Sequence, residues 1–524
     1  MIIAAAVTVW MAGCTAGAGS PVNQARMVWM TDAWSRAIRP ALAGQLALRW
    51  DGAHWSLDAG AAEVKVENIA ASAYFAQPLL DAGINLALSD CDRVRLDEIA
   101  DYYLTAFGRF ATFGDLIRAR GPLRDKLRAG DFTGDSATRT LRWLRAASKT
   151  MPARSAECLL CVSQFLHPAA RLIRLFATLP LGDLNSVERR FITSYEQLIV
   201  QDQVLRFAYE APLELGLSGG ASHGAVDGWR ALALLPRAKR TLYPSGLRDT
   251  DLWLLSEAAE LLAAHGSAPS LVLLSASDSA RLFDFLDIGV KLLQGSATRR
   301  TVAHDSAGNP IEGLDFFEGE FSRYADDAFA GDSSPTFPTA PTARVDSIGW
   351  DISHATRIPV VLRSLWDARR RTGESFPSDT DLSQAAHQLS YRAFDGDMAR
   401  PLFFNFMDGT DGWYRVGYAG RGQWGYPPSR YCDGRDVSRQ CLGTAVLGRW
   451  GVLVAFDPHL QQLADRLIEL ASTRDSATIA FRDRYYFQDG PFSFDVSPGV
   501  RPSVPLFELL AGFAQPALEW AHSQ

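Results

Sequence analysis

The stretch DTDLWLLSEAAELLAAHG, residues 249–266, carries the pattern that decides the fold. Its apolar residues recur every three or four positions, which is the period of an α-helix with one buried face. It opens on aspartate, a residue favoured at helix N-caps, and closes on glycine, a common helix stop signal. The stretch therefore predicts an amphipathic helix.

The same pattern recurs along most of the chain. The other segments that carry it are 22–42, 91–119, 136–151, 184–211, 277–295, 352–373, 381–396, 447–456, 459–472 and 504–524. About a dozen helical segments are well above the base rate for a mixed fold. The prediction is a mainly α fold.

Strand signals are few. Residues 46–58, LALRWDGAHWSLD, predict a hairpin that turns at Asp51–Gly52. Residues 299–321 predict a second hairpin, turning at Asn309–Pro310, and residues 477–490 a third strand element. We expect a few short β-hairpins on a helical body.

The composition is that of an ordinary soluble globular protein, because 47% of the 524 residues are hydrophobic and 21% are charged. The net charge of -7 and the pI near 5.8 argue against a nucleic-acid partner, since binding nucleic acid needs a positive surface. Fourteen tryptophans are more than packing alone requires.

The N-terminus resembles the export signal of a bacterial lipoprotein, and a plain hydrophobic N-terminus is the alternative. Residues Ile2 to Ala12 form an apolar run too short to span a bilayer, and Met11-Ala12-Gly13-Cys14 resembles a bacterial lipobox. We expect residues 1–13 to be a signal peptide, with Cys14 lipidated and the protein held in the bacterial periplasm or cell envelope by that anchor alone.

An exported protein can keep disulfides. Cys432 and Cys441 bracket the loop CDGRDVSRQC and predict a local bridge. Cys158 and Cys161 have the spacing of half a zinc site, but no second pair follows at usable spacing. Buried thiols or a structural bridge are the better interpretation, and we expect no metal and no cofactor.

Three clusters in the second half carry candidate chemistry. The first is LDFFEGEF, residues 314–321. Glu318 and Glu320 point the same way on an extended segment, so they could divide acid and base work. A solvated hairpin face is the alternative.

The second cluster is IGWDISHATRIP, residues 348–359, with Trp350, Asp351 and His354. Asp351 could cap the following helix, act in catalysis, or do both. His354 lies one turn into that helix, where its ring could face a cleft. The segment GDSSPTFPTAPTARVDS, residues 331–347, precedes it and suits an active-site loop or a domain boundary.

The third cluster spans residues 394–431 and includes DGTDGWYRVGY. Flat rings beside fixed donors and acceptors suit a sugar, because the rings stack on C–H faces while polar groups hold hydroxyls. DGTDG lacks the spacing and the closing Glu of an EF-hand. The candidate residues are Asn405, Asp408, Asp411, Trp413, Tyr414, Arg415, Tyr418, Trp424 and Tyr426.

Helical pairs joined by polar loops could form a toroid, a solenoid or two bundles. A toroid, complete or incomplete, places aromatic and acidic loops over a central cleft. We expect a helical first part over residues 14–335 and a second part over 336–524 that carries most site loops, in two domains or one.

The lipobox, the helical pairing and the aromatic–acidic loops together resemble bacterial (α/α)-toroid carbohydrate-active enzymes. The resemblance is architectural and covers most of the chain loosely. It implies an oligo- or polysaccharide substrate but transfers no catalytic residue, since fold analogy does not fix a reaction.

The leading functional expectation is a glycoside hydrolase that uses two carboxylates, one as acid and one as base or nucleophile. The candidates are Asp351, Glu318, Glu320, Asp408 and Asp411. A polysaccharide lyase or uronyl epimerase is the alternative, with His354 or Tyr414 as base and Asn405 or Arg415 neutralising a uronate. A non-catalytic glycan-binding or scaffold lipoprotein is the third possibility.

Overall fold

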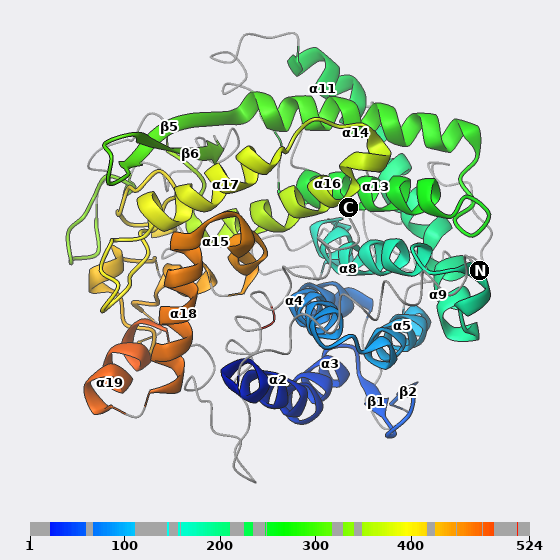
Figure 1. The fold of residues 1–524 in the computed structure, drawn as a ribbon, viewed down its shortest axis with the longest axis horizontal. Coiled ribbons are helices and arrows are strands. Elements are labelled where there is room, and N and C mark those ends of the chain that lie inside the picture. Colours follow the sequence, from blue (N-terminus) through cyan, green and yellow to red (C-terminus); the bar gives the residue numbers. More distant parts are fainter. Residues whose placement is uncertain are drawn as a thin grey trace.

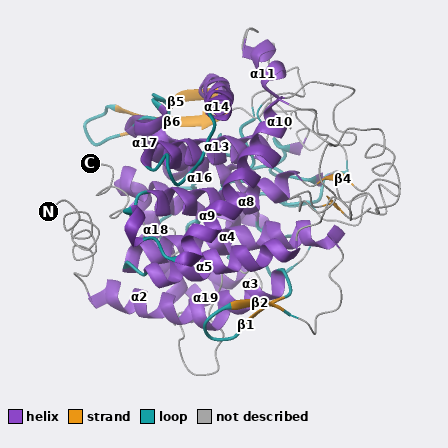
Figure 2. Cartoon of the chain, turned by 90° about the vertical axis from the view of Figure 1, so that its right-hand side faces the viewer, coloured by secondary structure: helices purple, strands orange, loops and turns teal. Residues whose placement is uncertain are grey.

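A computed structural model describes residues 21–58, 66–109, 144–145, 156–157, 159–209, 225–233, 247, 249–316, 329–339, 348–416, 425–436, 438–446, 448–473, 475–486 and 511. The described chain is mainly helical, as predicted, with short antiparallel strand pairs at its periphery (Figures 1 and 2). The α-helices are α2 (Pro21–Ala33), α3 (Arg39–Gln45), α4 (Val66–Asp90), α5 (Arg93–Ala106), α8 (Leu159–Ala177), α9 (Ser186–Gln197), α10 (Arg206–Tyr209), α11 (Ala225–Ala233), α13 (Asp249–Ser267), α14 (Ala276–Ser296), α15 (Ile352–Ala355), α16 (Arg357–Thr372), α17 (Asp379–His387), α18 (Pro458–Ser472) and α19 (Ser476–Tyr485).

Tighter and wider helical turns extend or connect these helices. The π-helical segments are η1 (Trp34–Ile38), η4 (Leu198–Leu205) and η7 (Gln388–Ala393). The 3₁₀ segments are η2 (Phe107–Arg109), η3 (Leu181–Asp183), η9 (Ser429–Tyr431), η10 (Leu442–Val446) and η11 (Arg449–Phe456). The expected helix 447–456 is therefore 3₁₀ rather than α.

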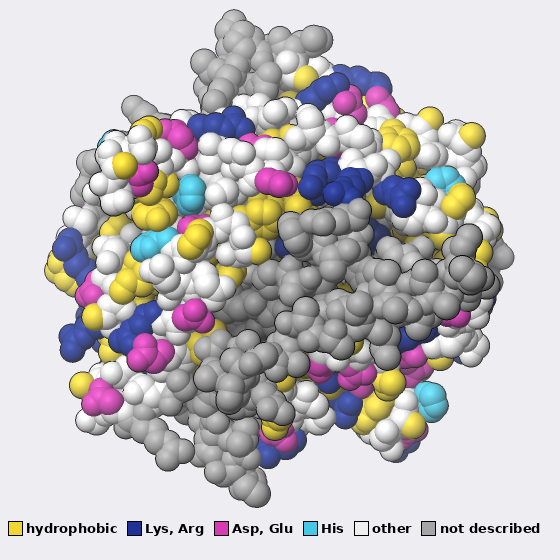
Figure 3. All heavy atoms as spheres, in the orientation of Figure 1, with side chains coloured by type: hydrophobic (Ala, Val, Ile, Leu, Met, Phe, Trp, Pro, Cys, Tyr) yellow, Lys and Arg dark blue, Asp and Glu magenta, His cyan; other side chains and the backbone are white. Residues whose placement is uncertain are grey.

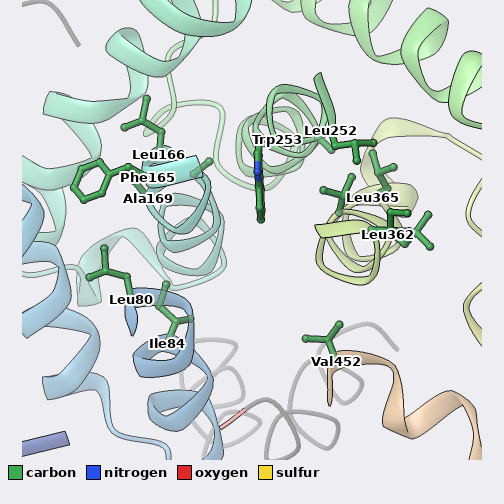
Figure 4. Packing of buried hydrophobic residues seen from close by; sticks show 14 of the residues in the cluster. Leu80, Ile84, Phe165, Leu166, Ala169, Leu252, Trp253, Leu362, Leu365 and Val452 are labelled. Carbon is green, nitrogen blue, oxygen red and sulfur yellow. The ribbon is translucent and has the colours of Figure 1, made fainter. Parts of the chain in front are cut away.

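Four helices lie toward the middle of the molecule and pack in the order α4, α8, α13, α16 (Figure 1). Each of these packs against the next helix along the chain as well, in the pairs α4–α5, α8–α9, α13–α14 and α16–α17. Figure 4 shows the buried apolar side chains that α4, α8, α13, α16 and η11 contribute to one common core, including Leu80, Leu166, Trp253, Leu362 and Val452.

Helix α13 is more deeply buried than its sequence predicted. Every residue from Thr250 to Ala264 is buried, so this helix has no solvated face. An amphipathic helix with one buried face was expected at 249–266. The helix is confirmed, but the expected solvated face is wrong. The polar residues are accommodated in part by ion pairing, since Glu260 binds Arg174 of α8.

Helix caps follow the predicted chemistry. Asn185 and Ser378 form capping boxes with Glu188 and Asp381 at the starts of α9 and α17. Gly373 ends α16 with a φ of 78°, a left-handed conformation that suits glycine.

The strand predictions are mixed. The hairpin β1 (Leu48–Trp50) and β2 (Trp55–Leu57) is confirmed. Strands β5 (Ala297–His304) and β6 (Pro310–Phe316) also form a hairpin. Its turn occupies residues 305–309, so Pro310, which was expected in the turn, is the first residue of β6. The two hairpins lie at opposite ends of the molecule in Figure 2.

Other assignments differ from the sequence analysis. Residues 477–490 were expected to be a strand, but Asp475 caps α19 and makes residues 476–485 helical. Leu144 and Arg145, expected in a helix, form β3, which pairs with β4 (Ala156–Glu157). The remainder of 136–151, and 504–524 apart from Ala511, lie outside the described residues. Helices α4 and α8 were not predicted.

The Cys432–Cys441 disulfide is confirmed, with the two Cα atoms 5.1 Å apart. Cys91 and Cys161 are also disulfide-bonded. Cys158 lies outside the described residues.

Removing the Cys432–Cys441 bridge should destabilise the fold. On the chain-entropy description, closing so short a loop contributes about 2 to 3 kcal/mol. We expect a Cys432→Ala/Cys441→Ala double variant to lose that free energy of unfolding in urea. A single Cys441→Ala variant should lose a similar amount, and an unchanged urea midpoint in the double variant would contradict the prediction.

Candidate functional site

Two separate segments are joined by backbone pairing at the start of α15. Asp351 forms an antiparallel bridge with Phe406. The Ile352 N–H donates to the Asn405 carbonyl at 2.9 Å, and the Met407 N–H donates to the Trp350 carbonyl at 2.9 Å. The second and third sequence clusters therefore meet.

Asp351 caps α15 and also binds His354. Its Oδ1 accepts the backbone N–H of Ser353 at 3.1 Å and that of His354 at 3.2 Å, and the Ser353 hydroxyl donates to the same oxygen at 2.5 Å. Its Oδ2 lies 2.6 Å from His354 Nδ1. One carboxylate therefore serves as cap and as the orienting partner of an imidazole.

The environment keeps the Asp351 carboxylate ionised. Burial alone raises its pKa, because a charge loses solvation when it is buried. The contact with His354, the Ser353 hydroxyl and the Arg415 guanidinium outweigh burial, and the net effect lowers the pKa of Asp351 well below its usual range. Asp351 is thus an acceptor at any pH near neutrality.

Tyr414 and Arg415 approach the other sides of the His354 ring. The Tyr414 hydroxyl lies 3.3 Å from Nδ1, and Arg415 Nη2 lies 3.4 Å from Nε2. Arginine can only donate and an ionised aspartate can only accept. With its ring proton on Nδ1, His354 donates to Asp351 through Nδ1 and accepts from Arg415 through the lone pair on Nε2.

The backbone around Tyr414 fixes this arrangement. Tyr414 and Tyr426 exchange two backbone hydrogen bonds, of 2.9 and 2.7 Å. Arg415 has a φ of 56°, a left-handed conformation that is costly for a residue with a side chain and that concentrates at functional sites. Gly412 is required for packing, because a Cβ there would lie 1.7 Å from the Ala330 carbonyl oxygen.

Arg415 is held as a cation beside this cluster. Burial tends to lower the pKa of Arg415, but Tyr414 and the Asp351 carboxylate outweigh it and raise that pKa above its ordinary value. The group at this point, which we call the His354 centre, consists of Asp351, Ser353, His354, Tyr414 and Arg415. The His354 side chain is 12% exposed, so the centre is largely desolvated.

Three of the predicted polar candidates are hydrogen-bonded within or between loops. Both carboxylate oxygens of Asp411 bind Ser429, through its backbone N–H at 3.0 and 3.1 Å and its hydroxyl at 2.8 Å. The Asn405 amide donates to the Gly412 and Pro427 carbonyls at 2.7 and 2.9 Å. Asp408 accepts the Thr410 N–H at 2.9 Å and is buried.

The predicted aromatic residues are mostly packed. Trp350 is buried in the main core. Trp413 is 2% exposed, contacts Phe329 and Val416, and donates its indole N–H to the Ser334 carbonyl at 2.9 Å. Tyr426 is partly buried and faces the Tyr414 ring with centroids 6.1 Å apart. Trp413 therefore fastens the 329–339 segment instead of forming an open stacking platform. Glu318, Glu320, Tyr418, Trp424 and Cys14 lie outside the described residues.

Asp315, at the end of β6, forms a second buried acidic group near Gly349 and Asp408. Its Oδ2 lies 3.2 Å from Arg300 Nη2. Burial raises the pKa of Asp315 to about 7; Arg300 opposes this shift, and the Asp408 carboxylate adds to it. In the folded state Asp315 is protonated below that pH.

Asp315 should make stability depend on pH. Because its pKa is higher in the folded than in the unfolded state, its favourable contribution is complete below about pH 4 and is lost as pH rises through 7. We expect the free-energy advantage of wild type over Asp315→Asn to fall by a few kcal/mol across this range, measured by urea unfolding at each pH. A constant difference would contradict the assignment.

No family model matches the chain, and no curated protein or solved structure matches it. Within the described part of the chain, no group of three or more His, Cys, Asp or Glu side chains is placed to hold a metal ion. Among the helices that the structure describes, none combines the length and apolarity needed to cross a bilayer.

Proposed function

We propose that the protein is a polysaccharide-modifying enzyme that removes the proton next to the carboxylate of a uronate residue. The observation that carries this proposal is the position of His354, whose Nδ1 lies 2.6 Å from Asp351 while Arg415 lies 3.4 Å from Nε2. An oriented base beside a fixed cation suits proton abstraction from a carbon that bears a carboxylate.

Each member of the His354 centre would have one role. Arg415 would bind the uronate carboxylate and stabilise the charge that develops when the C5 proton leaves. Once Arg415 turns from His354 Nε2 to the uronate carboxylate, Nε2 would take that proton, and Asp351 would stabilise the imidazolium that forms. Tyr414 would donate its hydroxyl proton.

The destination of the Tyr414 proton decides the product. If Tyr414 protonates the leaving glycosidic oxygen, the C4–O bond breaks and a C4=C5 double bond forms, which is the lyase reaction. If a proton returns to the opposite face of C5, the uronate is epimerised. Both reactions begin with the same proton abstraction.

Hydrolysis by paired carboxylates receives less support from the described residues. Asp351 is occupied by Ser353 and His354, and both oxygens of Asp411 bind Ser429. A hydrolase needs one carboxylic acid and one carboxylate available to the bond. We therefore favour the lyase or epimerase over the glycoside hydrolase.

The direct test is a panel of uronate-containing and neutral polysaccharides. A lyase creates an unsaturated uronate that absorbs in the ultraviolet, and an epimerase exchanges the C5 proton with deuterium from D₂O. We expect one of these signals with a uronate polymer and neither with a neutral glucan. Reducing ends released without either signal would favour hydrolysis, and binding without any product would favour a non-catalytic glycan-binding protein.

For the architecture we propose an incomplete (α/α) toroid. Support comes from the packing order α4, α8, α13, α16 and from the pairing of each with the following helix. An experimental structure whose first and last interior helices do not face a common axis would contradict this.

We also propose that the enzyme resides in the bacterial envelope, anchored through Cys14. The lipobox-like tetrapeptide 11–14 supports this placement. Cys14→Ser should move the protein from the membrane fraction to the soluble fraction and remove a lipid-sized mass. Unchanged fractionation, with no lipid mass on the wild type, would contradict the anchor.

A further inference from the structure

Helix α15 carries His354 but is only 4 residues long. Helices this short are not stable by themselves in water, so the orientation of α15 depends on the groups bound at its two ends. Asp351 caps the first end, as described above. Thr356 follows the last residue of α15 and connects it to α16. No role has been given to Thr356 so far.

The Thr356 side chain closes the helical turn that contains Ser353 and His354. Its hydroxyl donates to the Ser353 carbonyl at 2.8 Å, and its backbone N–H donates to the His354 carbonyl. Carbonyls at the end of a helix lack partners within the helix, and these two bonds supply them. Because Thr356 is 2% exposed, its hydroxyl depends on protein partners rather than on bulk water.

Arg449 binds the same hydroxyl from the other side. Its Nη1 donates to Thr356 Oγ1 at 3.3 Å, and its Nη2 donates to Gln77 Oε1 at 2.9 Å. A hydroxyl that accepts from a cation is a better donor, because hydrogen bonds in a chain polarise one another. Arg449 therefore strengthens the bond from Thr356 to α15 and joins that helix to α4.

Buried groups hold Arg449 in place. Gln77 is fully buried and also accepts from Gln164 of α8 at 3.0 Å. Gly448 has a φ of 93°, a conformation that suits glycine, and it turns the chain from η10 into η11 just before Arg449. The 3₁₀ segment η10 packs against α15 as well. The second end of α15 is thus fixed relative to the core helices α4 and α8.

The two halves of the His354 centre have separate supports. His354 lies on α15, whereas Tyr414 and Arg415 lie on the segment that pairs with Tyr426. A change at Thr356 should therefore move the imidazole while leaving the Arg415 cation in place. In the proposed reaction His354 acts in proton transfer and Arg415 binds the substrate, so such a change should lower kcat and not raise KM.

We propose that Thr356 is a positioning residue for His354, and that Arg449 holds the Thr356 hydroxyl in the required place. Its effect on turnover rests on the proposed function. Thr356 acts through the helix that bears the imidazole and not on the substrate. A displacement of about 1 Å can lower a rate by about a hundredfold, so one hydrogen bond at the end of a single helical turn has a measurable effect.

Thr356→Val tests the proposal directly, because valine has a similar shape without the hydroxyl. We expect kcat on a uronate polymer to fall by about tenfold or more, with KM nearly unchanged. Thr356→Ser keeps the hydroxyl and should restore kcat. Arg449→Met should lower kcat as Thr356→Val does, and it tests the same contact from the other side.

Arg482→Met is the matched control. Arg482 is also a buried arginine, 7% exposed, and it donates to the Ala471 carbonyl at 3.3 Å. Its removal should lower stability, because that carbonyl loses a donor. It should leave kcat unchanged, since Arg482 lies on α19 and does not contact α15. Thermal unfolding of all variants separates a loss of stability from a loss of positioning.

A second measurement does not need turnover. Diethyl pyrocarbonate acylates unprotonated imidazoles, and peptide masses give the rate at each histidine. His354 is 12% exposed and should react slowly in wild type, faster in Thr356→Val and Arg449→Met, and at the wild-type rate in Thr356→Ser. Other histidine side chains reach the surface on the face shown in Figure 3. His54, which is 71% exposed, gives the reference rate in every variant.

The two measurements separate this proposal from the proposed function. Faster acylation of His354 in Thr356→Val, with no turnover of a uronate polymer by wild type, would support the positioning role and contradict the enzymatic one. Wild-type kcat and wild-type acylation in Thr356→Val would overturn the positioning role. So would a loss of kcat that Thr356→Ser fails to restore, or a loss that appears in KM alone.

Discussion

His354→Gln should lower turnover of a uronate polysaccharide by at least about a thousandfold, within the range that general acid–base groups contribute. Glutamine can still donate a hydrogen bond to Asp351, which lies 2.6 Å from the imidazole. It cannot accept a proton at near-neutral pH. The variant therefore removes the base while keeping the buried carboxylate partnered.

Ser353→Ala provides the matched control. It removes the hydroxyl that donates to Asp351 at 2.5 Å but leaves the imidazole and Arg415 in place. We expect it to lose less than about tenfold in turnover, because Asp351 keeps two backbone N–H donors and its contact with His354 when the hydroxyl is removed. Turnover by His354→Gln within tenfold of wild type would exclude His354 as the base.

Trp413→Ala should destabilise the fold by about 3 to 5 kcal/mol, the usual loss when a buried tryptophan is truncated. The ring is 2% exposed, meets Phe337 with centroids 5.3 Å apart, and donates to the Ser334 carbonyl. Truncation leaves a cavity and an unpaired carbonyl. Urea unfolding measures the loss.

Trp413→Phe should lose less, because it keeps most of the buried area and removes only the indole N–H. The sequence interpretation, in which Trp413 stacks on a sugar, predicts a different result: weaker glycan binding with nearly unchanged stability. Stability within about 1 kcal/mol of wild type for Trp413→Ala would support that interpretation and contradict the packing seen here.

The sequence allowed the residues of the His354 centre to be singled out, because Asp351, His354, Tyr414 and Arg415 were all candidates of the second and third clusters. A residue that caps a helix leaves a local signal, so Asp351 at a helix start was recognisable. Burial was less predictable. Trp413 and Asn405 belong to a stretch rich in aromatic and polar side chains. The residues that bury these side chains lie elsewhere in the chain, so the stretch taken alone resembles a binding loop.

Helix α4 was missed for a related reason. It is apolar around most of its circumference, so the contrast between its two faces is weak. The signal that could have revealed α4 is the polar stripe Gln77, Asp81 and Asn85 in an otherwise apolar run. Helix α8 does have a clear contrast between two faces, and the sequence analysis overlooked it. The opposite error occurred at 476–485, where alternating aromatic and charged residues suggested a strand although Asp475 provides a helix cap.

The measurement that tests the central claim most directly is the mass of products formed from an oligo-uronate in H₂¹⁸O. If His354 starts an elimination, the fragments carry an unsaturated end and contain no ¹⁸O, so the pair of fragments is lighter by one H₂¹⁸O, about 20 Da, than the pair that hydrolysis would give in this solvent. If it starts an epimerisation, the same digest in D₂O gains one deuterium per converted residue without chain cleavage. Saturated fragments that contain ¹⁸O would contradict the account and return the function to hydrolysis.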